Sequence, residues 1–137
     1  MKIQILKDQQ NLIEGYEHVM MSGAELDLSR FSNNECLEIL ADNILDAVPI
    51  NYMQQTLKLL TDKLRMGGKL IIGGTDLRLF CKQVLNQSIS PTDANYIISQ
   101  CQSMTNLEEI VSLISTTNLK VKTTNINGVH FEISCIR

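Results

Sequence analysis

Tryptophan is absent from this chain of 137 residues, aromatic residues make up only 4%, and proline occurs twice. No apolar run approaches the roughly 20 residues that cross a bilayer, and no secretion signal opens the chain, so we expect no membrane partner. Basic residues are also few: 12 Lys and Arg stand against 15 Asp and Glu, a net charge of −3, and nowhere do three stand together. Because nucleic acids need a concentrated basic face, we expect no nucleic-acid partner either.

The four cysteines form no metal or redox motif. They are Cys36, Cys81, Cys101 and Cys135. Successive cysteines stand 45, 20 and 34 positions apart, with no Cys-x-x-Cys pair and no neighbouring histidine. This spacing excludes a zinc ribbon and a thioredoxin-type pair, and a disulfide-stapled secreted domain would be shorter and richer in cysteine. We therefore expect buried free thiols, no metal site and a cytoplasmic protein.

The residues that are present have the composition of a folded globular protein, with 44% hydrophobic and 20% charged residues. The length is that of one domain, and neither a linker nor an internal repeat divides it, so we expect a single domain over residues 1–137. Isoleucine, asparagine and lysine are frequent whereas alanine and arginine are rare. That bias indicates an AT-rich genome, such as that of a small-genome bacterium or a phage.

Hydrophobic periodicity predicts strands that alternate with helices. Strands are expected over residues 2–6, 17–21, 36–41 and 69–72, helices over residues 49–65, 75–85 and 105–117, and a further helix that begins at Ser90-Pro91. Ser90 and Thr105 are the expected N-caps of the last two helices. Gly67 or Gly68 is expected to cap the first helix, and Gly73-Gly74 to turn the chain out of a strand. Asn127-Gly128, between strand-like residues 119–125 and 129–136, predicts a hairpin.

This alternation predicts the α/β class: a three-layer sandwich around a mostly parallel, twisted sheet that ends in an antiparallel hairpin. In open α/β sheets, ligands bind outside the carboxyl ends of the strands. Residues expected at that edge are the candidate ligand-binding site: Asp27, Leu28, Ala41, Asp42, Asn43, Gly73 and Gly74. Thr75 and Asp76 are expected at the same edge.

Three blocks, in order and at matching spacing, resemble the class I S-adenosylmethionine-dependent methyltransferases. Residues 27–49 (DLSRFSNNECLEILADNILDAVP) follow the block that a compact group of these enzymes has as DL…F.DN…D.I.A.HVLEHLP. Residues 64–72 (LRMGGKLII) follow LKPGGKL.I, and residues 74–77 (GTDL) stand in place of PDL. Residues 14–19 (EGYEHV) are similar to the segment GW.NVD. The resemblance implies a reduced Rossmann-like methyltransferase fold, S-adenosylmethionine as the cofactor and methyl transfer as the reaction.

The sequence departs from this family at the residues that hold the cofactor. The family has a glycine motif after its first strand, where a Cβ would take space that the ligand needs, whereas this chain has Leu6-Lys7-Asp8. The family's second strand ends in an acid that accepts hydrogen bonds from both ribose hydroxyls; Met20 stands there and cannot accept them. We therefore expect S-adenosylmethionine to bind weakly or not at all. The chain is expected to act without catalysis, by binding a protein partner or a small ligand.

A further departure from the family concerns the catalytic residue, whose identity the sequence does not decide. The family's HVLEH block is replaced by residues 42–46 (DNILD), without histidine, so Asp42 and Asp46 are the candidate bases for methyl transfer to oxygen. The alternative interpretation is that Asp42 and Asn43 cap a strand end and Asp46 faces water. Two other hypotheses stay open: an active methyltransferase of a small molecule or protein with an atypical or inter-subunit cofactor site, and a self-associating scaffold whose thinly covered sheet needs a partner.

Overall fold

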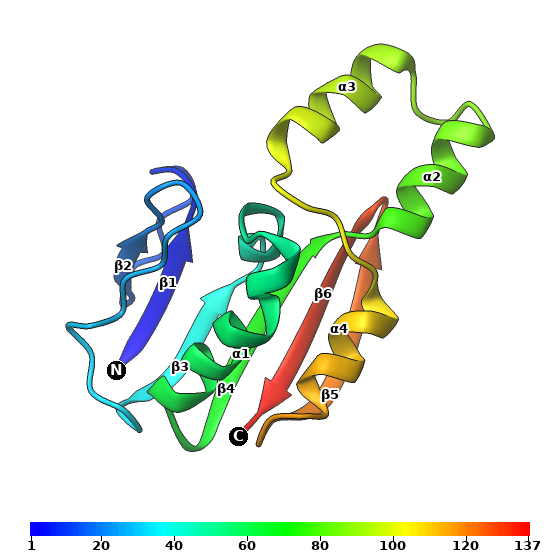
Figure 1. Ribbon diagram of the computed structural model, residues 1–137. Helices are drawn as coiled ribbons and strands as arrows, with labels where there is room; N and C mark the ends of the chain where they lie inside the picture. The colour runs from blue at the N-terminus through cyan, green and yellow to red at the C-terminus, as the bar shows by residue number, and fades with distance from the viewer.

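Six strands form one mixed sheet in the order β2-β1-β3-β4-β6-β5, and the computed structural model describes all 137 residues (Figure 1). The strands are β1 (Lys2–Leu6), β2 (Glu17–Met20), β3 (Cys36–Ala41), β4 (Leu64–Thr75), β5 (Lys120–Asn127) and β6 (His130–Ile136). The first four are parallel, and β6 is antiparallel to both β4 and β5. This confirms the predicted α/β class with a mostly parallel sheet and a C-terminal antiparallel hairpin.

Helices α1 (Met53–Lys63) and α4 (Leu107–Ile114) lie side by side over one face of the sheet (Figure 1). Two short 3-10 turns, η1 (Ile44–Ala47) and η2 (Ile50–Tyr52), join β3 to α1. Helices α2 (Leu77–Leu85) and α3 (Pro91–Gln100) stand beyond the carboxyl end of β4, away from the sheet (Figure 1). None of these helices combines the length and the apolar character that a membrane span requires.

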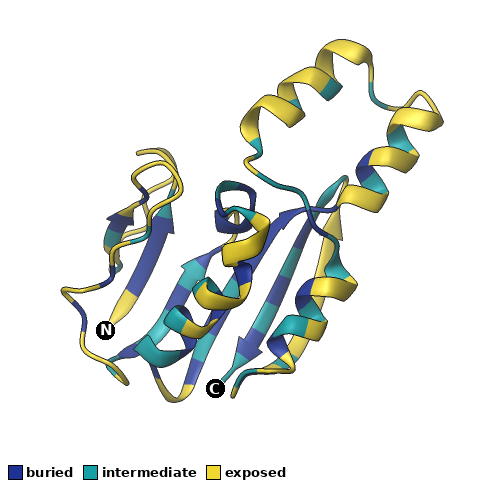
Figure 2. Ribbon diagram, viewed as in Figure 1, coloured by how far each residue is buried: buried dark blue, intermediate teal, exposed yellow.

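The core lies between the sheet and the helices α1 and α4. Alternate residues of the strands face it, as in β6, where Phe131, Ile133 and Cys135 are fully buried (Figure 2). Leu57 of α1 and Ile110 of α4 are fully buried against them. Each such side chain contributes about 1.5–3 kcal/mol by leaving water, so this single layer of helices anchors the fold.

The opposite face is covered near β1 by the segment that joins β1 to β2, and not by a helix. Gln4 is buried beneath it: its side-chain amide donates to the Asn11 carbonyl oxygen (2.9 Å) and accepts from the Ile13 N–H (2.9 Å). The Tyr16 hydroxyl donates to Glu38 (2.7 Å), and burial together with this carboxylate raises the pKa of Tyr16 to about 12. On this face, the cover near β1 is therefore an irregular segment of ten residues, 7–16, and not a helix.

Two predictions at glycines are wrong because strand pairing decides the conformation. Helix α1 ends at Lys63, and Gly67 (φ +77°) lies in an irregularity of β4, where its N–H donates to the Arg137 carbonyl oxygen (2.8 Å). Gly73 and Gly74 do not lead the chain out of β4, because they pair with Glu132 and Phe131 of β6. Residues 64–75 therefore form one long strand instead of a helix cap, a short strand and a turn.

The other element ends differ from the predictions by up to four residues, since α1 begins at Met53 instead of residue 49 and α4 ends at Ile114 instead of residue 117. Ser90 caps α3 as predicted, accepting from the Asp93 N–H (3.2 Å), but Asn106 caps α4 in place of Thr105, which is buried. The C-terminal hairpin is confirmed. Asn127 pairs with His130, so the two-residue turn consists of Gly128, at a φ of +64°, and Val129.

All four cysteines are free thiols, as predicted, but only two are buried. Cys36 and Cys135 are fully buried, and burial raises the pKa of Cys135 to about 11, which keeps that thiol protonated and unreactive. Cys101 is half-buried, and Cys81 is exposed because α2 stands away from the sheet.

Candidate functional site

A hollow of about 450 Å³ opens at the carboxyl ends of β1 and β3, and we call it the edge pocket. Its polar lining is supplied by Gln4, Lys7, Asp8, Gln10, Asn11, Asp42, Asn43 and Gln100, and its apolar lining by Ile5, Leu6, Ile13, Leu40 and Ile44. A concave site with a few convergent polar groups at the ends of parallel strands is the usual place for a small ligand in such folds.

Two neighbouring strands place the charged groups of the edge pocket. β1 and β3 are parallel and paired, so both chains leave the sheet at the same edge. Lys7 and Asp8 follow the end of β1, and Asp42 follows the end of β3. Asn43 precedes η1 without capping it, so its side-chain amide does not serve as a helix cap. One ammonium, two carboxylates and several amides can therefore contact a small ligand that carries charges of both signs.

Asp46 does not face water, contrary to the alternative interpretation of the sequence. The residue is only 7% exposed, and its carboxylate accepts from the Thr75 N–H (2.6 Å) and from the Thr75 hydroxyl (2.9 Å). The Cys101 thiol lies 3.7 Å from the same hydroxyl, and burial raises the pKa of Cys101. Asp46 thus fastens η1 to the end of β4, and both of its carboxylate oxygens already accept hydrogen bonds.

Of the seven residues predicted to bind a ligand, Asp42 and Asn43 line the edge pocket. Leu28 and Ala41 are buried in the core. Asp27 lies apart, in a hollow of about 510 Å³ beside α1, where hydrogen bonds from Ser29 lower the pKa of its carboxyl group.

Gly73 and Gly74 are enclosed by protein atoms. A Cβ at Gly73 would lie 2.2 Å from the Phe131 carbonyl oxygen and 2.5 Å from that of Asp42, and one at Gly74 would lie 3.0 Å from Asp46 Oδ1. The absence of a Cβ at Gly73 therefore makes room for the backbone of Phe131 and Asp42, which belong to the two adjoining strands or their ends.

Several residues of the edge pocket were not among the predicted ligand-binding residues. Lys7 and Asp8 directly follow a predicted strand, so the strand-end rule that selected Asp42 also selects them. Gln100 gives no such signal, because it ends α3 and reaches the pocket only through the return of the chain from that helix. No group of three or more His, Cys, Asp and Glu side chains is placed to hold a metal ion.

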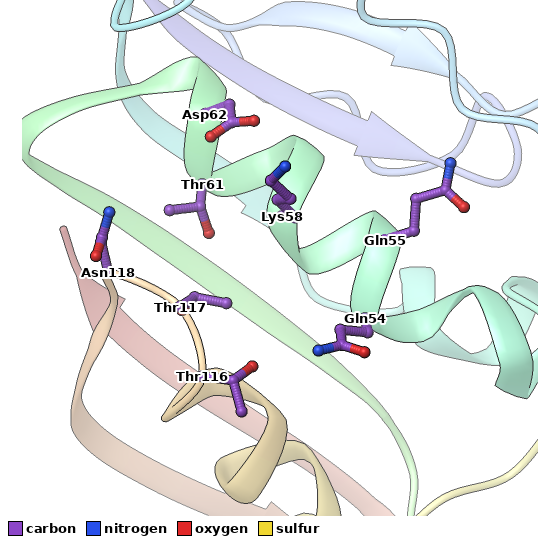
Figure 3. Close-up of a pocket in the computed structure, with 8 residues that line it drawn as sticks. All are labelled: Gln54, Gln55, Lys58, Thr61, Asp62, Thr116, Thr117 and Asn118. Atoms are coloured by element: carbon purple, nitrogen blue, oxygen red, sulfur yellow. The ribbon is translucent and has the colours of Figure 1, made fainter.

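A second hollow, of about 410 Å³, lies between α1 and the segment after α4 (Figure 3). Three threonines line it, but their hydroxyls donate to carbonyl oxygens of their own helices: Thr61 to Leu57, Thr116 to Leu113, and Thr117 to Ile114. Thr61 and Gln54 belong to α1, and Gln54 lies opposite Thr116 across this hollow (Figure 3). Because this hollow does not lie at the strand ends and its hydroxyls are already used as donors, the edge pocket is the stronger candidate.

Replacing Gln4 with leucine is expected to release the segment over β1 and to lower the free energy of unfolding by about 1–3 kcal/mol, because the Ile13 N–H and Asn11 carbonyl oxygen lose their partner. Hydrogen exchange should accelerate in residues 8–14 while β4 and β6 keep their protection. Gln9→Leu, at an exposed position in the same segment, is the control. Unchanged exchange in Gln4→Leu would show that Gln4 does not hold this segment.

Comparison with known proteins identifies the fold through structure alone, since no protein-family model and no curated sequence matches. A SAM-dependent methyltransferase from Archaeoglobus fulgidus superposes with a TM-score of 0.62 at 9% identity, over 90% of this chain and 68% of its own. A SAM-dependent methyltransferase from Methanosarcina mazei gives 0.59 at 14%, over 89% and 67%. The 1,6-didemethyltoxoflavin-N1-methyltransferase of Burkholderia thailandensis, solved with S-adenosylhomocysteine, gives 0.57 at 13%, over 89% and 51%.

The chain therefore has the fold of the class I S-adenosylmethionine-dependent methyltransferases, as the sequence blocks predicted. It spans only 51% to 68% of the length of these three proteins. Identities of 9% to 14% establish a shared fold and not a shared chemistry.

Proposed function

We propose that this chain is a non-catalytic binding protein built on the methyltransferase fold, and that its edge pocket takes a small polar ligand other than S-adenosylmethionine. The observation that carries the proposal is the residue sequence at the end of β1, where Lys7 and Asp8 stand in place of a glycine turn and line the edge pocket. A glycine turn in this place would leave backbone N–H groups open to a ligand.

The residues present do not fit the cofactor that the fold family uses. Lys7 and Asp8 line the space that a glycine turn would leave free. The segment that follows is held in place by hydrogen bonds to the Gln4 side chain. β2 ends at Met20, which is in register with Leu6, is 39% exposed and does not line the edge pocket. A thioether accepts hydrogen bonds only weakly, so the ribose hydroxyls would find no carboxylate there, at a cost of about 1–3 kcal/mol for each bond to a charged group.

The edge pocket has the chemistry to hold a small zwitterion or a polar amide. Lys7 is available to a carboxylate or another anion, and Asp8 and Asp42 to a cation. Apolar side chains of Leu6, Ile13 and Leu40 form the remaining wall and can cover a short aliphatic part of the ligand.

S-Adenosylmethionine and S-adenosylhomocysteine, each at saturating concentration, are expected to leave the melting temperature unchanged. A ligand at 100 times its Kd stabilises the folded state by about 2.7 kcal/mol, which in a domain of this size raises the melting temperature by several degrees. A rise of several degrees with either compound would overturn the proposal.

A second candidate function is methyl transfer with an atypical cofactor site, since the exposed Asp42 carboxylate lines the edge pocket, where it can contact a methyl acceptor. This candidate predicts methylation of an acceptor that disappears in Asp42→Asn, whereas the non-catalytic proposal predicts no transfer by either chain. Asp27→Asn is the matched control, because Asp27 is also exposed but lies outside the edge pocket.

A further inference from the structure

A hollow of about 760 Å³ lies at the amino end of β5, at the end of the sheet opposite the edge pocket, and we call it the basic hollow. It is lined by three cations, three apolar side chains and three uncharged polar side chains: Lys120, Lys122 and Arg137; Met66, Leu119 and Ile136; Ser115, Thr117 and Asn118. The start of β5 and the C-terminus lie together at this end of the sheet, away from α2 and α3 (Figure 1). No aspartate or glutamate side chain lines the hollow.

Strand pairing gathers basic residues that are scattered in the sequence. Ile136 pairs with Lys120 on one side and with Lys69 on the other, and Arg137 follows it directly. The Arg137 N–H donates to the Gly68 carbonyl oxygen (2.9 Å), which holds this residue against β4. β4 and β5 together contain four basic residues and no acid: Arg65, Lys69, Lys120 and Lys122. The fold therefore forms a cationic surface that no run of the sequence contains.

The acids nearest in the fold lie outside the basic hollow. Glu132 is the one acid of β6, and it pairs with Gly73 in the other half of β4. Asp62 lines the neighbouring hollow beside α1. A main-chain carboxylate at Arg137 would lower the net charge of the lining from +3 to +2 (3 − 1). The lining therefore keeps an excess of positive charge, which concentrates anions from solution.

The cations of the basic hollow have donors to spare. Lys120 and Lys122 are exposed, and neither belongs to the two ion pairs of the chain. The hydrogen bonds of the Arg137 guanidinium all come from Nη1, and its Nε is buried without a partner. The hydroxyls of Ser115 and Thr117 already donate to carbonyl oxygens of α4. A ligand in this hollow would therefore meet charged donors from β5 and β6.

We propose that the basic hollow binds a small polyanion that carries a diphosphate group. Three cations around one hollow can offset most of the charge of a diphosphate, whereas a single carboxylate would leave two of them unpaired. Lysine ammonium groups and an arginine guanidinium are the side chains that bind phosphate oxygens best. The apolar side chains of Met66, Leu119 and Ile136 can contact an organic group attached to the diphosphate.

Calorimetric titration with inorganic pyrophosphate at low salt tests this site, and we expect one molecule to bind per chain. Lys120→Gln with Lys122→Gln should raise the Kd at least about tenfold, because two of the three cations are lost. Arg78→Gln with Lys82→Gln removes the same charge from α2, outside the basic hollow, and should leave the Kd nearly unchanged. Lys120→Arg with Lys122→Arg keeps both charges and should retain binding.

Three results would overturn the proposal: no binding of pyrophosphate at about 1 mM, binding that survives the glutamine variant of β5, and equal losses in the β5 and α2 variants, which indicate attraction by net charge alone. Circular dichroism and sedimentation check that each variant is folded and no more associated than the unmodified chain. ADP separates the two sources of the diphosphate. A lower Kd for ADP assigns an organic ester, and any other Kd the free anion. S-Adenosylmethionine contains no phosphate, so these outcomes are independent of the proposed function.

Discussion

Replacing Gly73 with alanine is expected to lower the free energy of unfolding by about 3 kcal/mol or more, the upper end of what overpacking costs. The added Cβ would lie 2.2 Å from the Phe131 carbonyl oxygen and 2.5 Å from that of Asp42. Both neighbours are backbone atoms of the strands next to β4 or of their ends, so no side chain can rotate to relieve the contact. Urea denaturation followed by circular dichroism measures the loss.

Two other glycines give a graded control for this prediction. Gly74→Ala should cost less, because its nearest neighbours are Asp46 Oδ1 and the Leu45 side chain, both at 3.0 Å. Gly128→Ala meets no atom within 4 Å and carries only the strain of a left-handed residue, about 1–2 kcal/mol. If Gly73→Ala is no worse than Gly128→Ala, the close packing of β4 between its neighbours is wrong.

Removal of the Asp46 carboxylate by alanine is expected to cost about 2–4 kcal/mol of stability, since the buried Thr75 N–H and hydroxyl both lose their acceptor. Asp46→Asn should lose less, because the amide oxygen can still accept from one of these donors. Asp42→Ala changes an exposed side chain and should cost no more than about 0.5 kcal/mol.

The comparison separates a structural aspartate from one that is free for ligand binding. Equal and small losses in Asp46→Ala and Asp42→Ala would contradict the structural role of Asp46. A large loss in Asp42→Ala would show that Asp42 supports the fold instead of lining a site that is open to ligands.

Local sequence patterns correctly predicted the elements whose conformation depends mainly on neighbouring residues. β1 and β3 have a clear apolar pattern, and α3 begins at Ser90-Pro91, so all three elements lie where they were expected. The helix cap proposed for Gly67 and the turn proposed for Gly73-Gly74 failed for one reason. Their conformation is set by pairing with β6, about 60 residues further along the chain, and a local pattern contains no information on that partner.

The same distinction holds for the candidate site: residues at strand ends were predictable from the sequence, and residues that depend on distant segments were not. Asp42 and Asn43 were found because strand ends meet at one edge of a parallel sheet. Asp46 was misjudged because its burial depends on Thr75, which is 29 positions away. Gln100 reaches the edge pocket only because the chain returns toward the sheet at the end of α3, which no spacing in the sequence reveals.

We propose that a methyltransferase fold persists here without the cofactor site of the methyltransferases. Calorimetric titration of the chain with S-adenosylhomocysteine tests this proposal, because this demethylated product of the cofactor reports binding without any need for a methyl acceptor. We expect no measurable heat of binding at ligand concentrations up to about 1 mM. A Kd of about 1 mM would correspond to a binding free energy of about −4.1 kcal/mol. Saturable binding of one molecule per chain with a low micromolar Kd would contradict it.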